Sequence, residues 1–261
     1  MGVPRGSWFV CLHVREPGYH MQWHKKHPGT RNTHPYTYLK AIQEIVDRGG
    51  YVVRMDDKSM TPMPPMEGLV DYAHCPEKSD FMDIFLCATC RFFMGTNSGL
   101  GLVPPLFGVP CAMTNWSPIG LRQRYPQDLF IPKLVYSIRR GGFLTFGEMF
   151  TSPAGWGQFS DYFKQNDLFV TDNTPHDLRD LAIEMIDTLD NPSCVPRASL
   201  ELRAQFEAVA LSHGSYRGAH IGCRFLQKYA ALLSSSGTLE IQDSAQARRL
   251  MRPEVPGEAP V

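Results

Sequence analysis

Between residues 8 and 190, short apolar segments with strand character alternate with segments whose apolar residues recur at helical spacing. We expect strands at 8–14, 51–55, 69–73, 91–96, 109–113 and 168–172. We expect helices at 36–48, 79–90 and 175–190, a short or broken helix at 100–107, and one or two more helices between 200 and 233. Strands that alternate with helices favour a parallel sheet with helices on both faces. The sequence therefore predicts an α/β fold, a Rossmann-like doubly wound parallel sheet.

The ends of the expected helices carry recognisable capping residues. Ser79 or Asp80 is placed to cap the second helix, and Pro175 occupies the first turn of the third. We expect residues 1–233 to form one domain with C-terminal helices. Residues 234–261 contain Ser, Pro and Gly with few large apolar groups, so we expect a flexible tail with at most a short helix.

The composition excludes several classes of protein. The formal net charge is zero, so there is no global basic footprint for nucleic acid. The most apolar window is broken by prolines, which argues against a transmembrane segment, and the N-terminus lacks the pattern of a signal peptide. Most of the seven cysteines, including the pair Cys87 and Cys90, stand in apolar segments and are expected to pack in a core. We therefore expect a cytoplasmic protein, with a peripheral contact at the inner membrane face left open.

Polar residues follow three of the expected strands. In doubly wound sheets, ligands bind beyond the carboxyl ends of the strands. The residues that the sequence places there are His13, Arg15, Glu16, Asp56 and Asp57, together with the segment GTNSGLG at 95–101.

The segment GTNSGLG has the composition of an anion-binding turn. Its backbone N–H groups and the hydroxyls of Thr96 and Ser98 can bind an anion at the start of a helix. The guanidinium group of Arg15 can bind the same anion through two parallel hydrogen bonds. Together these groups indicate a diphosphate pocket. The segment does not have the position or spacing of the dinucleotide fingerprint. Three plainer interpretations stay open: an ordinary strand-to-helix turn, a salt bridge from Arg15 to Asp56, and a core role for His13.

Three motifs, HVRE, VVRMDD and SDFMDIFLCATCRFFMGTNSG, resemble the ordered motifs of the glycosyltransferases that use GDP-fucose. That group contains the α1,6-fucosyltransferases, the nodulation fucosyltransferases and the protein O-fucosyltransferases. Over residues 5–150 the chain also resembles a family of bacterial glycosyltransferases linked to surface-polysaccharide synthesis. Arg31 and Asn32 match this closer family, but no role can be assigned to them from the sequence.

The resemblance implies a GT-B glycosyltransferase, of which this chain would be the C-terminal, donor-binding half. The donor would be a nucleotide diphosphate sugar, with a GDP-sugar as one option. The acceptor would be a glycan or a lipid-linked glycan, and the reaction would be metal-independent and inverting. Arg15 would bind the β-phosphate and neutralise the leaving diphosphate, and Glu16 would be a candidate base. The implied donor-binding residues are His13, Arg15, Asp56, Asp57, Asp83, Thr96, Asn97, Ser98 and Gly99.

Within this set, Asp56 or Asp57 would face the nucleoside. Asp83 would bind the nucleotide or hold Arg15. Two features depart from the family pattern. Glu16 stands where the GDP-fucose group often has a second basic residue, so the donor need not be GDP-fucose. The motifs of the donor-binding half begin at residue 8, so an acceptor-binding domain would have to come from a missing N-terminal domain or from a partner chain.

Other functions stay open. The chain could be a non-catalytic nucleotide-binding protein or a partner subunit derived from a GT-B enzyme. A phosphoesterase is a further option, but it would need a nucleophile or a metal cluster at the strand ends. Asp56 and Asp57 are the only residues there that favour this function. Asn115 to Pro118 could stack on a base or a sugar, or simply pack. A metal site among the clustered histidines is less favoured than a solvated basic loop; these are His13, His20, His24, His27 and His34.

Overall fold

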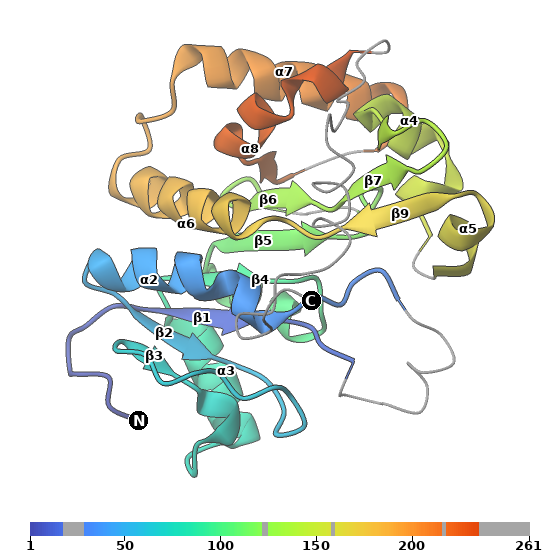
Figure 1. The fold of residues 1–261 in the computed structure, drawn as a ribbon. Helices are drawn as coiled ribbons and strands as arrows, with labels where there is room; N and C mark the ends of the chain where they lie inside the picture. The colour runs from blue at the N-terminus through green and yellow to red at the C-terminus, as the bar shows by residue number, and fades with distance from the viewer. Residues whose placement is uncertain (18–28, 122–124, 158–159, 216–217, 235–261) are drawn as a thin grey trace.

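The structure is a computed structural model that describes residues 1–17, 29–121, 125–157, 160–215 and 218–234 (Figure 1). The tail beyond Ser234 and the histidines His20, His24 and His27 lie outside these ranges.

Seven parallel strands form the main sheet, in the order β3-β2-β1-β4-β5-β6-β10 (Figure 1). The strands are β1 (Phe9–His13), β2 (Tyr51–Arg54), β3 (Leu69–Val70), β4 (Phe92–Gly95), β5 (Cys111–Trp116), β6 (Leu129–Pro132) and β10 (His220–Ile221). The chain builds outward from β1 in one direction and from β4 in the other, so the strand order reverses between these two strands. This topology confirms the predicted Rossmann-like α/β fold.

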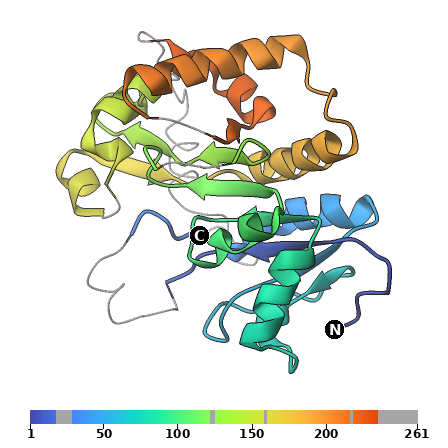
Figure 2. The same ribbon diagram turned by 180° about the vertical axis from the view of Figure 1, so that it is seen from behind.

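Helices cover both faces of the main sheet. The helix α2 (Leu39–Asp47), preceded by the 3-10 turn η1 (Pro35–Tyr38), packs against α6 (Pro175–Asp190) on one face. The opposite face carries α3 (Asp80–Thr89) and two short 3-10 helices, η3 (Leu100–Leu102) and η4 (Pro104–Phe107) (Figure 2). The central strands are buried on both sides, as parallel strands between two helix layers should be.

Capping side chains determine where two of these helices begin. Ser79, rather than Asp80, caps α3, because its side chain accepts a hydrogen bond from the Met82 N–H. Thr174 caps α6 through a reciprocal capping box with Asp177, and the predicted proline is at the first turn. Each cap satisfies backbone donors that a helix start would otherwise leave without a partner.

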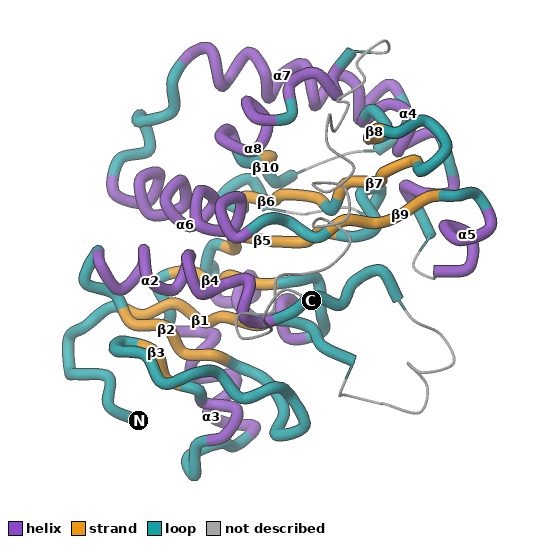
Figure 3. The backbone as a smooth tube through the Cα atoms, in the orientation of Figure 1, coloured by secondary structure: helices purple, strands orange, loops and turns teal. Residues whose placement is uncertain are grey.

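A second, antiparallel sheet was not anticipated. It contains β8 (Gly142–Phe143), β7 (Leu134–Ser137) and β9 (Leu168–Thr171), in that order (Figure 3). The strand expected at 168–172 therefore exists but does not join the parallel sheet. The short helices α4 (Phe146–Thr151), η5 (Pro153–Gly155) and α5 (Ser160–Gln165) lie between β8 and β9 along the chain. Strand periodicity is the same in both kinds of sheet, so the sequence could not distinguish them.

Three expected elements differ in extent. The third strand stops at Val70, because the chain turns into the 3-10 helix η2 (Tyr72–His74). The region 100–107 forms two 3-10 turns rather than an α-helix, since Pro104 and Pro105 lack N–H donors. The fifth strand runs to Trp116, so Asn115 and Trp116 lie within it, at a bulge where Asn115 has a φ of 48°.

The C-terminal part of the described chain is helical, as predicted. It contains α7 (Arg197–Ser212), α8 (Cys223–Lys228) and the 3-10 turn η6 (Ala230–Leu233). A buried ion pair between Arg203 of α7 and Glu184 of α6, at 2.7 Å, joins this layer to the rest of the core.

Candidate functional site

A polar cavity of about 410 Å³ lies beyond the carboxyl ends of β1, β2 and β4. Eight of the ten residues singled out from the sequence line it: His13, Arg15, Glu16, Asp56, Asp57, Asp83, Ser98 and Gly99. The cavity sits where the strand order reverses between β1 and β4, which is the place where sheets of this topology bind ligands. The fold thus gathers side chains from three separate strand ends into one site.

The backbones of β1 and β4 meet closely at this site. His13 and Gly95 are register partners, and a Cβ placed on Gly95 would stand 2.2 Å from the His13 carbonyl oxygen. Only glycine fits there without displacing backbone. By contrast, a Cβ on Gly99 would meet no protein atom within 4 Å, so this part of the turn is open to a ligand.

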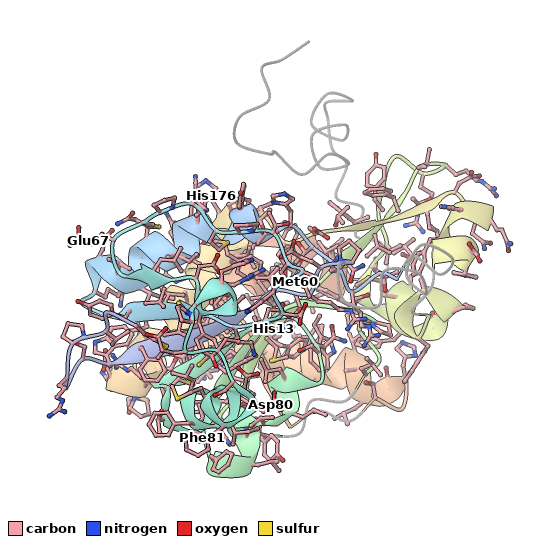
Figure 4. All side chains as sticks on the ribbon, turned by 90° about the horizontal axis from the view of Figure 1, so that it is seen from below. His13, Met60, Glu67, Asp80, Phe81 and His176 are labelled. Carbon is pink, nitrogen blue, oxygen red and sulfur yellow. The ribbon has the colours of Figure 1, made fainter. Side chains whose placement is uncertain are left out.

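His13 links Ser98 to Asp56. Its Nδ1 lies 3.2 Å from Ser98 Oγ, and its Nε2 lies 3.3 Å from Asp56 Oδ2. The contact with Ser98 is a hydrogen bond, whereas Asp56 Oδ2 is buried with no hydrogen-bond partner among the described residues, so its contact with Nε2 is one of proximity alone. The ring also stacks on Phe93 of β4, with centroids 6.4 Å apart. His13 is buried, as a core role would require, and it also lines the polar cavity. Figure 4 shows it in the interior of the molecule, between Met60 and Asp80 in this view.

Two arginines converge on the turn after β4. Arg15 lines the polar cavity, Arg31 lines a neighbouring cavity, and Ser98 and Gly99 line both. Burial lowers the pKa of Arg15, and the nearby Asp56 partly offsets this effect. The pKa of Arg31 is lowered by burial and by the positive charge of Arg15, so the two guanidinium groups repel each other. The sequence could not place Arg31 beside Arg15, because the two residues lie sixteen positions apart along the chain.

Glu16 takes part in a buried ion pair instead of standing free as a base. Its Oε1 accepts from Arg54 Nη2 at 2.7 Å, and its Oε2 accepts from both the N–H and the hydroxyl of Thr61. Arg54 is fully buried and also lies 3.5 Å from Asp71. A carboxylate whose two oxygens accept such bonds is poorly suited to accept a substrate proton. The arrangement favours a structural role for Glu16 over the catalytic role suggested by its position.

Thr96 and Asn97 each make a hydrogen bond to a neighbouring loop, and of the two Asn97 also lines a cavity. The fully buried Thr96 uses its hydroxyl to accept the Arg15 N–H at 2.9 Å, so it positions the start of the Arg15 loop. Asn97 donates to the Ser117 carbonyl at 2.7 Å and lines the neighbouring cavity. These contacts favour indirect roles for Thr96, whereas Asn97 and Ser98 remain accessible from a cavity.

The acidic residues at the rim are held by local contacts. The Asp57 carboxylate accepts from the Ser59 N–H at 2.9 Å, and this contact lowers its pKa. Asp83 pairs with Lys78, a residue that the sequence did not single out. The contact between Asp83 and Arg15 suggested by the resemblance stays a prediction. The Oδ1 atom of Asp83 is buried with no hydrogen-bond partner among the described residues.

The neighbouring cavity, of about 320 Å³, is mainly apolar. It is lined by Met113, Trp116, Leu121 and Tyr125, and Trp116 is held by a hydrogen bond from its indole N–H to the Leu121 carbonyl at 3.2 Å. Asp128 also lines this cavity, and burial raises its pKa to about 6. Its Oδ1 accepts the Cys111 N–H at 2.8 Å. Asp128 was missed because it directly precedes β6, a strand that the sequence analysis did not predict.

The described cysteines in apolar segments and His34 have structural contacts. Cys11, Cys87 and Cys90 are buried together in the core, where burial raises the pKa of the Cys11 thiol. Such thiols are unreactive, in agreement with the packing role expected for Cys87 and Cys90. His34 caps η1 by accepting from the Tyr36 N–H. Within the described ranges, no group of three or more His, Cys, Asp or Glu side chains has metal-binding geometry.

The described part of the chain contains no helix that is both long and apolar enough to cross a lipid bilayer.

The fold and the cavity define a Rossmann-like α/β protein with a ligand site at the reversal of its strand order. No family model, curated protein or solved structure matches the chain. The family resemblance carried by the sequence motifs therefore stays a prediction.

Proposed function

We propose that this chain binds a nucleotide diphosphate sugar and serves as the donor-binding half of a GT-B glycosyltransferase. The observation that carries the proposal is the pair of partly buried guanidinium groups, Arg15 and Arg31, which flank the Ser98–Gly99 turn. Two cations that repel each other favour a ligand with more than one negative charge. A diphosphate is such a ligand, and planar guanidinium groups suit its oxygens.

The two cavities suit the two ends of such a donor. The apolar cavity, with Trp116 and Tyr125, can take the flat face of a base. The polar cavity offers carboxylates, among them Asp57 and Asp83, that can accept hydrogen bonds from sugar hydroxyls. This orientation reverses the one implied by the resemblance, in which Asp56 or Asp57 would face the nucleoside.

In the transfer step, the bond between the sugar carbon and the β-phosphate oxygen breaks while the acceptor oxygen attacks the same carbon. Negative charge then builds up on the diphosphate, where Arg15 and Arg31 would stabilise it more strongly than in the ground state. The acceptor, a glycan or a lipid-linked glycan, must lose its hydroxyl proton to a base. Because Glu16 is engaged by Arg54, the base would be His13 or a group from a partner domain.

Calorimetry of the purified chain tests the proposal. GDP, UDP, CMP, ADP and dTDP are titrated with and without a divalent metal. We expect metal-independent binding of one diphosphate, lost in Arg15→Ala and in Arg31→Ala but kept in Arg139→Ala, an exposed arginine outside both cavities. Absence of binding by the folded chain would overturn the proposal. Binding without any sugar transfer would favour the non-catalytic alternative.

A second candidate function, a serine hydrolase acting on esters or phosphoesters, is favoured by the contacts Ser98–His13–Asp56. His13 would take the proton of Ser98 as its oxygen attacks, and Asp56 would stabilise the resulting imidazolium. Hydrolysis of p-nitrophenyl acetate or p-nitrophenyl phosphate that is abolished in Ser98→Ala but retained in Arg31→Ala would support this candidate. If neither substrate is hydrolysed, the hydrolase candidate is excluded and the donor-binding proposal is the one that remains.

A further inference from the structure

Arg31 belongs to a short segment without helix or strand, residues 30–33, which we call the Arg31 segment. The regular hydrogen bonds of a helix or a sheet therefore do not hold this segment in place. The positive charge of Arg15 also lowers the pKa of Arg31, so the two guanidinium groups push each other apart. The position of Arg31 beside the turn after β4 must come from contacts between the Arg31 segment and the rest of the chain.

Lys133 connects the Arg31 segment to the junction of the two sheets. It stands between β6 and β7, where the chain passes from the parallel sheet to the antiparallel one. Its Nζ atom donates to the Asn32 carbonyl at 2.6 Å and to Asp172 Oδ1 at 2.5 Å. The second oxygen of Asp172, which directly follows β9, accepts from the Thr33 hydroxyl at 2.6 Å. One ion pair thus holds two consecutive residues of the segment.

Two further hydrogen bonds fix the Arg31 segment at both ends. The Thr33 N–H donates to the Arg15 carbonyl at 3.0 Å, which joins the backbones that carry the two arginines. At the other end, the Thr30 hydroxyl accepts from Ser117 Oγ at 2.8 Å. Arg31 therefore stands between residues that are attached to the protein on either side of it.

Net stability alone does not account for the burial of Lys133. This side chain is almost fully buried, which is rare for a lysine. The cost of removing an ammonium group from water often exceeds what its attraction to a carboxylate returns, so apolar packing would be as stable or more so. An apolar side chain at this position could not donate to the Asn32 carbonyl. The lysine supplies a hydrogen bond to the backbone directly after Arg31.

We propose that Lys133, paired with Asp172, is a positioning residue that fixes the Arg31 segment and so keeps the Arg31 guanidinium group at the diphosphate site before the ligand binds. This inference rests on the proposed function and deepens its binding step. A segment that took up this position only part of the time would raise the apparent Kd by the inverse of that fraction. Holding two like charges together in advance therefore favours a ligand with more than one negative charge.

Hydrogen exchange of backbone amides, followed by NMR, tests the positioning without any ligand. The Thr33 N–H donates to the Arg15 carbonyl, so its exchange is slow only while the segment is in place. We expect Lys133→Met to speed this exchange by about tenfold or more and to leave the amides of β1 unchanged. The control is Lys228→Met, since Lys228 pairs with Asp177 and lines neither cavity. An unchanged exchange rate of Thr33 in Lys133→Met would overturn the inference.

Calorimetry with GDP, UDP, ADP and dTDP tests the consequence for binding. For the nucleotide that the natural chain binds, we expect Lys133→Met to raise Kd by about tenfold or more. In the Arg31→Gln background, the same change should raise Kd by less than about twofold, because no guanidinium group is left to position. A general loss of structure would weaken binding equally in both backgrounds, and that result would contradict a positioning role.

Thr33→Val is a second, milder variant. It keeps the shape of the side chain and removes the hydroxyl that donates to Asp172, so we expect both effects in smaller size. If the natural chain binds none of the nucleotides, the proposed function fails, whereas the exchange rate of Thr33 still decides whether Lys133 fixes the segment. If a nucleotide binds and Lys133→Met leaves its Kd unchanged, the proposed function stands and this inference fails.

Discussion

Gly95 of β4 lies against His13 of β1 so closely that a Cβ on the glycine would stand 2.2 Å from the His13 carbonyl oxygen. Because glycine has no side chain, the two strand ends can approach this closely where the strand order reverses. This approach places the turn after β4 next to the imidazole of His13, which contacts Ser98. The candidate site thus depends on a close approach of two backbones as well as on its side chains.

Gly95→Ala should therefore destabilise the protein, by roughly 1–3 kcal/mol or more, because backbone has to move to admit the methyl group. Gly99→Ala is the matched control. Its methyl group meets no protein atom within 4 Å and its φ of −59° suits alanine, so stability should not fall. Urea denaturation of the two variants measures the difference. Equal stabilities would contradict the close packing of β1 on β4.

Gly99→Ala should in addition weaken nucleotide binding, since its methyl group would occupy space at the turn that both cavities share. The expected loss of affinity is about tenfold or more, measured by the same calorimetric titration. Unchanged affinity would show that the ligand does not approach the backbone at this position.

Removing one of the two arginines should affect binding and stability in opposite directions. Arg31→Gln should lower diphosphate affinity by about 10- to 100-fold, as loss of one charge-assisted contact does. The same change should leave the melting temperature unchanged or raise it, because Arg15 no longer faces a like charge. Thermal unfolding with and without diphosphate checks both effects. A lower melting temperature without ligand would mean that Arg31 has a structural role.

The buried pair Arg54–Glu16 should be among the most sensitive positions of the chain. Arg54→Met would leave Glu16 buried without its main partner and should cost about 3–5 kcal/mol of folding free energy. The double variant Arg54→Met/Glu16→Leu should recover a large part of that loss, because no uncompensated charge remains. Equal losses in the single and double variants would show that the packing of the arginine, and not its charge, matters.

Asp128 should make stability fall as pH rises from about 4 to 6. Burial raises the pKa of its carboxyl to about 6, whereas the unfolded chain has an ordinary Asp pKa of about 3.9. Between these values the folded state holds more protons than the unfolded state, so stability decreases with pH and the penalty is fully present above about pH 6. A shift of about two units corresponds to about 2–3 kcal/mol.

Asp128→Asn separates this effect from the titration of other groups. The amide oxygen can still accept the Cys111 N–H, but it carries no charge to be desolvated. The variant should match the natural chain near pH 4 and exceed its stability at pH 7.5, as measured by urea denaturation at both values. A variant that is less stable at pH 7.5 would contradict the raised pKa.

Much of the fold was predictable from local patterns. The apolar periodicity located five strands of the main sheet, β1 to β5, and the helices α2, α3 and α6, because these elements bury apolar side chains in the core. The residues that end β1, β2 and β4 could be placed at one edge, since parallel strands share a direction. The segment 129–137 was missed because its apolar residues form a nearly continuous run, which hides the change from the parallel sheet at β6 to the antiparallel sheet at β7.

The sequence by itself determined the class of fold, the boundaries of most inner elements and the edge of the sheet where polar residues gather. Only the tertiary structure decided which of those residues face a cavity. It joined Glu16 to Arg54 in the core and brought Arg31 beside Arg15 at the turn after β4. The physical reason is that the apolar periodicity of an element depends on residues close together along the chain. The partner of a charged side chain depends instead on the strand order and the packing, which bring distant residues together.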